Sequence, residues 1–167
     1  MKTPLILLAL IIGLQSPQTY SWSDLLPAIR TVETGGSPND GLGALGDGGK
    51  AIGPYQIWAI YPTDAAERDK TLDNYRNCLN SKSYSEQVIR VYMHRYARSA
   101  SMQLDQGKAT LADLETVARI HNGGPRGAKK DATKKYWAKV ASHLKRKCPG
   151  SRPATLSSAR QHDPRTA

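Results

Sequence analysis

The sequence predicts one mainly helical domain of the α+β class, with a short glycine-rich hairpin or loop near its N-terminal third. Four segments repeat apolar residues at helical spacing. Eight of the 14 glycines fall between residues 35 and 53, a density that favours turns over helix. The chain has no long alternating pattern of the kind that marks strands, and no internal repeat.

Residues 1–21 are predicted to be a cleaved secretory signal peptide. One lysine precedes an apolar run over residues 4–14, which is shorter than the about 20 residues of a membrane-spanning helix. Small side chains at Thr19 and Ser21 fit the third and first positions before a cut, which leaves Trp22 as the mature N-terminus. Neighbouring cuts fit nearly as well. The protein is therefore expected to be secreted and extracellular.

Residues 22–148 then form a single domain of ordinary size. Residues 149–167 are rich in proline, serine and arginine and lack a periodic apolar pattern, so we predict a disordered basic tail. No segment after residue 21 is apolar enough to cross a membrane. Cys78 and Cys148 are the only cysteines, and in an oxidising compartment they are candidates for a disulfide bond.

The net charge of +10 predicts affinity for polyanions. Export makes the anionic bacterial envelope and lipid headgroups more accessible partners than nucleic acid. Nucleic-acid binding would require a recognisable module or an organised basic and aromatic face, and the sequence shows neither. Simple solubility is the alternative interpretation of the charge.

The first predicted helix begins at Ser23 and ends near Glu33. Pro27 falls in its first turns, where proline is tolerated. Its apolar positions recur at helical spacing: Leu25, Leu26, Ile29 and Val32. The glycine-rich loop that follows must be positioned by other elements, and residues 63–68 are only weakly helical.

Three further helices are predicted. One begins at Ser83, whose spacing to Glu86 is that of a capping box. Another begins at Thr110, with Asp113 three residues on, and ends at a Gly-Gly-Pro sequence. The last covers residues 131–144. Their apolar stripes are Val88, Val91, Tyr92 and Tyr96, then Leu111, Leu114, Val117 and Ala118, then Trp137, Val140, Ala141 and Leu144.

Glu33 is the candidate catalytic acid. Hydrolysis of a glycosidic bond typically needs one carboxylic acid to protonate the leaving oxygen and a second carboxylate to stabilise charge, attack carbon or activate water. Glu33 ends a helix after Ile29 and Val32, and partial burial there would raise its pKa and keep it protonated near neutral pH. An ordinary helix-terminal charge is the alternative interpretation.

Asp40 and Asp47, both on the glycine-rich loop, are the candidates for the second carboxylate. Asp47 is the stronger candidate because the glycines at 46, 48 and 49 let the backbone turn tightly and leave its carboxylate open to water. The alternative is that Asp47 only supports a turn.

Four short motifs occur in a fixed order. They are Glu-Thr-Gly-Gly at 33–36, Gly-Asp-Gly-Gly-Lys-Ala-Ile-Gly-Pro-Tyr-Gln-Ile at 46–57, Tyr-Met-His-Arg-Tyr at 92–96 and Ala-Arg-Ile-His-Asn-Gly-Gly-Pro at 118–125. Each is weak alone, but together they resemble the invertebrate-type lysozymes, the family that includes destabilase. The similarity covers roughly residues 29–140 and includes Gly127, Thr133, Tyr136 and Trp137.

The resemblance implies a lysozyme-like fold and hydrolysis of the β-1,4 bond between N-acetylmuramic acid and N-acetylglucosamine in bacterial peptidoglycan. It implies Glu33 as the general acid and Asp47 as the second carboxylate. The residues implied to bind the sugar are Tyr55, Gln56, His121, Asn122 and Gly123. For His121, a helix-end histidine near the negative pole of the helix dipole is the alternative. No metal, organic cofactor or stable protein partner is expected; the expected partners are peptidoglycan and the anionic envelope surface.

Three other functions stay open at this point. The same order of motifs also resembles bacterial lytic transglycosylases, which cleave with one glutamate, so a dispensable Asp47 would favour them. A non-catalytic cationic binding protein could use the basic helix of Lys134, Lys135 and Lys139. Isopeptidase activity is the least supported, because no Ser/Lys pairing is evident at residues 37 and 50. The chain also departs from the cysteine-dense family in having two cysteines.

Overall fold

The computed structural model describes residues 17–144, of which residues 19–144 form one compact unit. Its helices are α1 (Trp22–Thr34), α2 (Ile60–Ala66), α3 (Asn77–Asn80), α4 (Lys82–Tyr96), α5 (Arg98–Asp105), α6 (Leu111–Gly123) and α7 (Lys134–His143). Strands β1 (Leu45–Gly46), β2 (Ala51–Ile52) and β3 (Ile57–Trp58) form an antiparallel sheet in that order. The prediction of a mainly helical domain with a short hairpin is confirmed.

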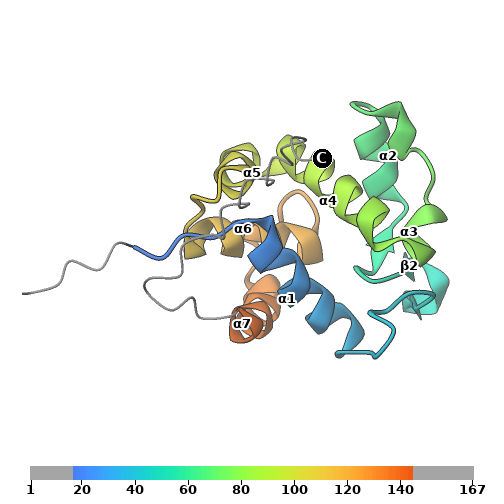
Figure 1. Ribbon diagram of the computed structural model, residues 1–167, viewed down its shortest axis with the longest axis horizontal. Coiled ribbons are helices and arrows are strands. Elements are labelled where there is room, and N and C mark those ends of the chain that lie inside the picture. Colours follow the sequence, from blue (N-terminus) through green and yellow to red (C-terminus); the bar gives the residue numbers. More distant parts are fainter. Residues whose placement is uncertain (1–16, 145–167) are drawn as a thin grey trace, which may run out of the picture. The chain divides into compact units, whose positions relative to one another are not determined.

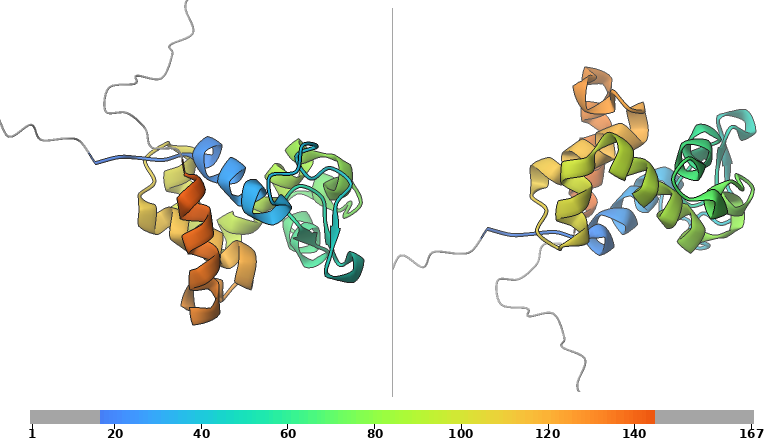
Figure 2. Two further views of the ribbon diagram at one scale, coloured as in Figure 1. Left: turned by 90° about the horizontal axis from the view of Figure 1, so that it is seen from below. Right: turned by 90° about the horizontal axis from the view of Figure 1, so that it is seen from above.

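The sheet and the helices α5 to α7 occupy opposite ends of this unit. Figures 1 and 2 show the sheet beside α2 and α3 at one end, and α5, α6 and α7 at the other, with α1 and α4 running between them. The α1 helix packs against α7, and α4 packs against α2, α5 and α6. The α1 helix runs from the end that holds α5, α6 and α7 toward the sheet. The side chains of its last turn therefore lie beside the sheet.

The N-cap of α1 is Ser21, where the sequence predicted Ser23. The Asp24 carboxylate accepts hydrogen bonds from the Ser21 backbone N–H (2.8 Å) and from its hydroxyl (2.9 Å). The Tyr20 backbone pairs with Ala109 through two hydrogen bonds of 2.9 and 3.1 Å, and its side chain is buried. Tyr20 and Ser21, predicted to be the end of the signal peptide, are therefore part of the folded unit. Residues 1–16 lie outside the described residues.

A chain that starts at Trp22 should be less stable than one that starts at Thr19. The shorter chain loses the buried Tyr20 ring and the Ser21 cap, which together correspond to about 3 kcal/mol of unfolding free energy. Urea unfolding of the two chains measures the difference. Equal midpoints would contradict the structural role assigned to these residues.

The later predicted helices correspond to α4, α6 and α7, and one of their starts is corrected. The N-cap of α4 is Ser81, whose hydroxyl accepts from the Tyr84 N–H (3.2 Å), so the predicted start at Ser83 is wrong. The capping box of Thr110 and Asp113 at the start of α6 is confirmed. Sequence reasoning missed α5, because its buried face is formed mostly by small residues that carry little apolar signal.

Aromatic residues fill much of the core, because the chain contains no phenylalanine. Trp22, Tyr55 and Tyr92 are the largest fully buried side chains. The Tyr92 ring stacks on Tyr61 with 3.8 Å between ring centroids. This stack places Tyr61 against α6, where its hydroxyl reaches His121. The core thus extends directly to the end of α6.

Cys78 is fully buried, and burial raises the pKa of its thiol to about 11. Its predicted partner Cys148 and the predicted tail at 149–167 lie outside the described residues, so the disulfide stays a prediction. Within residues 17–144, no helix combines the length and the apolar character needed to cross a membrane.

Candidate active site

The register of the sheet decides which side chains face outward. Gly46, Ala51 and Trp58 form one cross-strand row, while Ile52 and Ile57 pair in the next. Successive residues of a strand point to opposite faces. Ile52 and Ile57 are buried in the core, and the row of Gly46, Ala51 and Trp58 lies on the opposite face of the sheet, where Ala51 is buried and Trp58 is exposed.

This row forms one wall of a cavity of about 340 Å³ between the sheet, the end of α1 and the end of α6. The residues that line it are Glu33, Gly46, Asp47, Ala51, Gln56, Trp58, His121 and Asn122. The structure thus brings together both predicted carboxylates and three of the five predicted sugar-binding residues. These residues come from three segments far apart in the sequence.

Glu33 lies in the last turn of α1 with its side chain 17% exposed. The pKa of this carboxyl is raised from its usual 4.5 to about 7, mainly by burial and in smaller part by the negative charge of Asp47. In the opposite direction, the Tyr136 hydroxyl donates a 2.6 Å hydrogen bond to Glu33 Oε1 and lowers the pKa. Near pH 7, Glu33 is therefore present in both protonation states and can give up a proton.

His121 is neutral at the same pH, because burial lowers its pKa to about 4. Its Nε2 atom lies 3.1 Å from the Tyr55 carbonyl oxygen and 3.6 Å from Glu33 Oε1. A carbonyl oxygen can only accept a hydrogen bond, so Nε2 carries the hydrogen and Nδ1 is an acceptor. The Tyr61 hydroxyl lies 3.2 Å from this Nδ1 and 3.1 Å from the His121 carbonyl oxygen, to which it donates. His121 is therefore a neutral ring at the end of α6 that joins this helix to the sheet segment.

Asp47 lies on the cavity rim in a tight turn and is exposed. It has a φ of +47°, as does Gln56, which lines the same cavity. Left-handed backbone at residues other than glycine is uncommon and strained, and such positions cluster at functional sites. The strain at Asp47 and Gln56 is consistent with a site whose side-chain placement matters more than local stability.

Asp40, the other candidate carboxylate, does not line this cavity. It forms ion pairs with Arg30 (3.3 Å) and Lys82 (3.4 Å). These contacts fasten the glycine-rich loop to α1 and α4. Of the two acids that the sequence left open, only Asp47 shares the cavity with Glu33.

Two predicted sugar-binding residues are placed elsewhere. The Tyr55 side chain is fully buried and its hydroxyl donates to Glu86 (2.6 Å), so its ring cannot pack against a sugar. A side chain at Gly123 would collide with Thr133, so this glycine allows the end of α6 to pack closely against residue 133. Both residues adjoin the cavity lining in sequence, but neither lines the cavity itself, because Tyr55 points into the core from a turn and Gly123 packs against Thr133.

Sequence reasoning missed Trp58 and Tyr136. Trp58 is 46% exposed and lines both the first cavity and a neighbouring one of about 460 Å³. Its place two residues after Gln56, at the end of the same sequence motif, was a usable signal. Tyr136 had no local signal, because it lies 103 residues from Glu33 in the chain.

The second cavity is mostly aromatic and apolar. Its lining residues are Trp58, Ile60, Tyr61, Asp64, Tyr92, Tyr96, His121, Asn122, Gly124 and Pro125. Asp64 is its one acid, and the Tyr96 hydroxyl donates to that carboxylate at 2.6 Å. Between residues 17 and 144, no three His, Cys, Asp or Glu side chains are grouped so that they could hold a metal ion.

The sequence model of the destabilase family matches residues 34–143. The chain belongs to this family. The match includes every residue that lines the first cavity except Glu33, which precedes it by one position.

Invertebrate-type lysozyme 6 of Caenorhabditis elegans is 33% identical over 127 residues, which cover 71% of this chain and 84% of that protein. A lysozyme of Magallana gigas is 35% identical over 90 residues, which cover 54% of this chain but only 58% of the Magallana protein.

Solved structures of lysozymes share the fold of this destabilase-family protein. The lysozyme of Tapes japonica superposes with a TM-score of 0.53 at 30% identity, covering 75% of this chain and 91% of that one. The lysozyme of Meretrix lusoria, solved in complex with PliI of Aeromonas hydrophila, gives a TM-score of 0.55 at 28% identity and covers 73% and 89%. The predicted lysozyme-like fold is confirmed.

Proposed function

We propose that this protein is a lysozyme, which hydrolyses the β-1,4 bond between N-acetylmuramic acid and N-acetylglucosamine in bacterial peptidoglycan. The observation that carries the proposal is a single cavity that contains Glu33, with a pKa of about 7, and the carboxylate of Asp47. The relatives and solved neighbours named lysozyme support the same reaction. Defence and digestion are both served by this activity.

In this mechanism Glu33 donates its proton to the leaving glycosidic oxygen. Asp47 faces the same space and stabilises the positive charge that develops on the sugar, or activates water. The amides of Gln56 and Asn122 offer hydrogen bonds to sugar hydroxyl and acetamido groups. The exposed ring of Trp58 provides an apolar surface for the face of a sugar.

Gly46 and Ala51 have little or no side chain, so the part of the cavity wall that they form leaves room for a sugar ring. A side chain at Gly46 would collide with the Gln56 amide oxygen. Glycine at this position therefore allows the Gln56 side chain to lie along the strand, with its amide nitrogen bonded to the Gly53 carbonyl (3.0 Å). The same glycine thus shapes the wall and places a sugar-binding amide.

The released sugars distinguish hydrolysis from the transglycosylase reaction. Purified peptidoglycan is digested with the protein, and the products are identified by mass spectrometry. We expect reducing ends that have gained water, because Asp47 accompanies Glu33 in the cavity. Anhydro-sugar ends would contradict the proposal and favour a transglycosylase that uses Glu33 alone.

Replacement of Tyr136 by phenylalanine should shift the alkaline limb of the pH–activity profile upward. The Tyr136 hydroxyl lowers the Glu33 pKa, so its removal keeps Glu33 protonated to higher pH. A hydrogen bond of this kind corresponds to about half to one pH unit. The measurement is kcat/KM against pH for wild type and variant. A limb that stays in place or moves downward would contradict the role given to Tyr136.

Secretion is part of the proposal. It is supported by the apolar run at residues 4–14 and by the basic composition, which suits an anionic envelope. The hydrogen bonds of Tyr20 and Ser21 within the folded unit support a cut before residue 20. Expression of the full chain in an exporting host, followed by N-terminal sequencing, tests this. A mature protein that starts at Trp22 would contradict it.

A further inference from the structure

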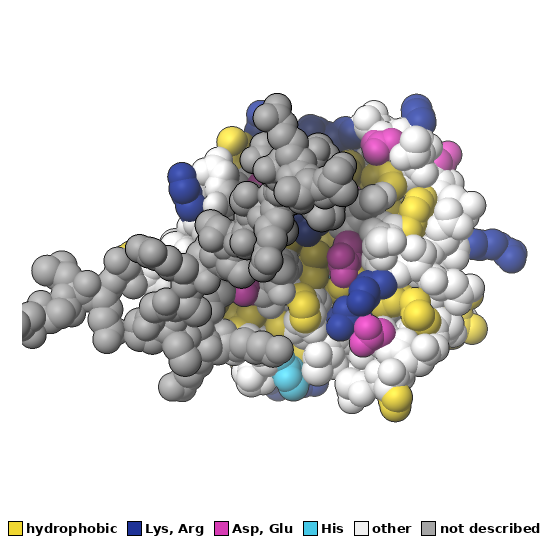
Figure 3. Space-filling view, in the orientation of Figure 1, with side chains coloured by type: hydrophobic (Ala, Val, Ile, Leu, Met, Phe, Trp, Pro, Cys, Tyr) yellow, Lys and Arg dark blue, Asp and Glu magenta, His cyan; other side chains and the backbone are white. Residues whose placement is uncertain are grey.

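Positive charge is concentrated in one segment of the folded unit. Between residues 17 and 144 the chain has 17 lysines and arginines and 13 acids, and residues 126–139 contain six of those basic residues and one acid. In the rest of this range the acids outnumber the bases by one. On the face shown in Figure 3, the visible basic side chains are scattered and several lie beside acidic ones. General solubility does not require such a concentration.

We call this segment the basic segment; its exposed cations are Arg126, Lys129, Lys130, Lys134, Lys135 and Lys139. It comprises two 3-10 turns, Gly127–Lys129 and Asp131–Thr133, and most of α7. The turns are coloured orange in Figure 2 and project from the helical end of the unit. They directly follow Gly124 and Pro125, which line the second cavity. The basic segment therefore begins where the cavity lining ends.

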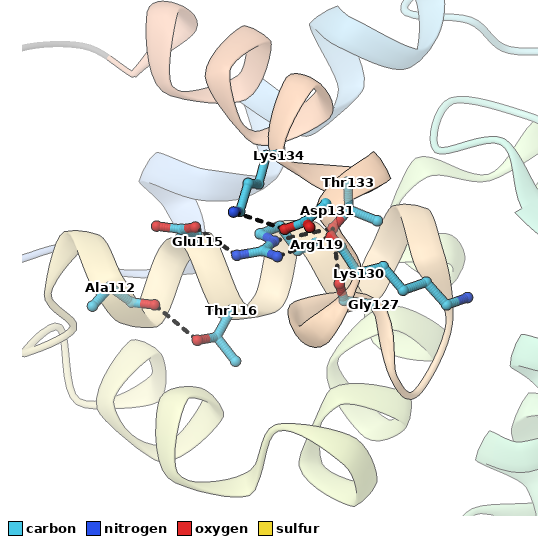
Figure 4. Close-up of polar contacts among 9 residues, drawn as sticks. All are labelled: Ala112, Glu115, Thr116, Arg119, Gly127, Lys130, Asp131, Thr133 and Lys134. Atoms are coloured by element: carbon cyan, nitrogen blue, oxygen red, sulfur yellow. Dashed lines mark hydrogen bonds and ion pairs between the residues drawn. The ribbon is translucent and has the colours of Figure 1, made fainter.

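Buried hydrogen bonds fix the backbone of the basic segment (Figure 4). Arg119, buried on α6, donates from Nε to the Thr133 hydroxyl (3.0 Å) and from Nη2 to the Lys130 carbonyl (3.0 Å). The Thr133 hydroxyl in turn donates to the Gly127 carbonyl (2.8 Å). Glu115 pairs with Arg119 at 2.8 Å and balances its charge. A surface held in place before binding loses little entropy when a partner arrives.

The surface chemistry of the basic segment fits a hydrophilic polyanion. Among residues 17–144, none of the exposed large hydrophobic side chains falls within 126–139, whereas insertion into a lipid surface requires an apolar face. Five of the six cations are lysines, compact point charges that can bind the phosphates of a flexible polymer without a fixed bidentate geometry. The one acid, Asp131, is paired with Lys134 at 2.7 Å.

We propose that the basic segment binds phosphodiester polymers attached to the bacterial cell-wall glycan, while the adjoining cavities hold the glycan itself. The identity of the glycan rests on the proposed function, but binding through the basic segment does not require hydrolysis. The arrangement holds the protein on the wall beside the bond that it cleaves.

Two triple variants with the same loss of charge test the location. The first replaces Lys129, Lys135 and Lys139 with glutamine. The control replaces three exposed cations outside the basic segment: Lys70→Gln, Arg98→Gln and Lys108→Gln. Both sets are surface substitutions, and equal thermal unfolding midpoints establish that both variants are folded.

Binding is measured by sedimentation with purified cell walls, in the Glu33→Gln background so that the walls stay intact. On walls that carry phosphodiester polymers, the first variant should bind about tenfold more weakly and the control within about twofold of the parent. On walls stripped of these polymers with hydrofluoric acid, all three proteins should bind alike. An equal loss in both variants, or a loss that persists on stripped walls, would overturn the proposal.

A neutral soluble substrate separates this proposal from the proposed function. With Glu33 intact, the first triple variant should hydrolyse N-acetylglucosamine oligomers at the wild-type rate, because the lining of the first cavity is unchanged. If this triple variant hydrolyses the neutral oligomers more slowly than wild type, the basic segment acts in catalysis and the proposal fails. If the wild type hydrolyses neither these oligomers nor peptidoglycan while the binding pattern holds, the proposed function fails alone.

Discussion

Replacement of Glu33 by glutamine should lower the rate of peptidoglycan hydrolysis by about 1,000-fold or more. Glutamine keeps the shape of the side chain and can still accept the hydrogen bond from Tyr136, but it has no proton to transfer to the leaving oxygen. The measurement is the initial rate of clearing of a peptidoglycan suspension.

The same substitution should stabilise the fold at neutral pH. The folded-state pKa of Glu33, about 7, lies above its usual 4.5, so the folded state binds more protons than the unfolded state between these values. Stability from this group is therefore fully present below pH 4.5 and is lost as the pH rises to 7. Above pH 7, Glu33→Gln should be more stable than wild type by roughly 2 to 3 kcal/mol, and near pH 4 the two should be alike.

Glu67→Gln is the matched control, because Glu67 is exposed, pairs with Arg95 and does not line the first cavity. It should keep wild-type activity and show no comparable gain in stability with rising pH. If Glu33→Gln clears peptidoglycan at the rate of this control, Glu33 is not the acid. If Glu33→Gln is inactive but less stable at pH 7, the burial argument for its pKa is wrong.

Replacement of Asp47 by asparagine should lower the rate of hydrolysis by about 100-fold or more. Asparagine tolerates a positive φ as well as aspartate does, so the backbone at +47° is preserved and only the charge is removed. Loss of this charge also lowers the pKa of Glu33, because the repulsion from Asp47 raises it. The alkaline limb of the residual activity should therefore move to lower pH.

Asp40→Asn is the control for this variant, because Asp40 lies on the same loop and also has a positive φ of 53°. Its ion pairs with Arg30 and Lys82 are partly exposed, so its replacement should cost about 1 kcal/mol of stability and little activity. An active Asp47→Asn beside an inactive Asp40→Asn would reverse the assignment of the second carboxylate. Full activity in both variants would favour a mechanism with Glu33 alone.

The sequence was informative where the signal is local. The Glu33 helix was predicted from the spacing of its apolar residues, and the start of α6 from the capping residues Thr110 and Asp113. Helix starts with two closely spaced serines were misplaced by two residues, since Ser21 and Ser23, or Ser81 and Ser83, offer the same hydroxyl. The buried face of α5 was missed because small residues form most of it.

Contacts between segments far apart in the chain could not be predicted from the sequence. The hydrogen bond from Tyr136 to Glu33 depends on the packing of α7 against α1, which no local pattern encodes. Tyr55 lies in the right motif, yet the turn before β3 directs its ring into the core toward Glu86. The flanking glycines already favoured Asp47 over Asp40, but only the path of the loop shows that Asp47 lines the cavity while Asp40 pairs with Arg30.

Titration of the Glu33 carboxyl measures directly whether this group can act as the general acid near neutral pH. The chain has four glutamates, so NMR with carboxyl-labelled glutamate gives few signals, and Glu33→Gln identifies the one that disappears. We expect this signal to titrate near pH 7, at the same pH as the alkaline limb of kcat/KM on peptidoglycan. A Glu33 carboxyl that titrates near 4.5, or a limb at a different pH from the titration, would contradict its assignment as the general acid.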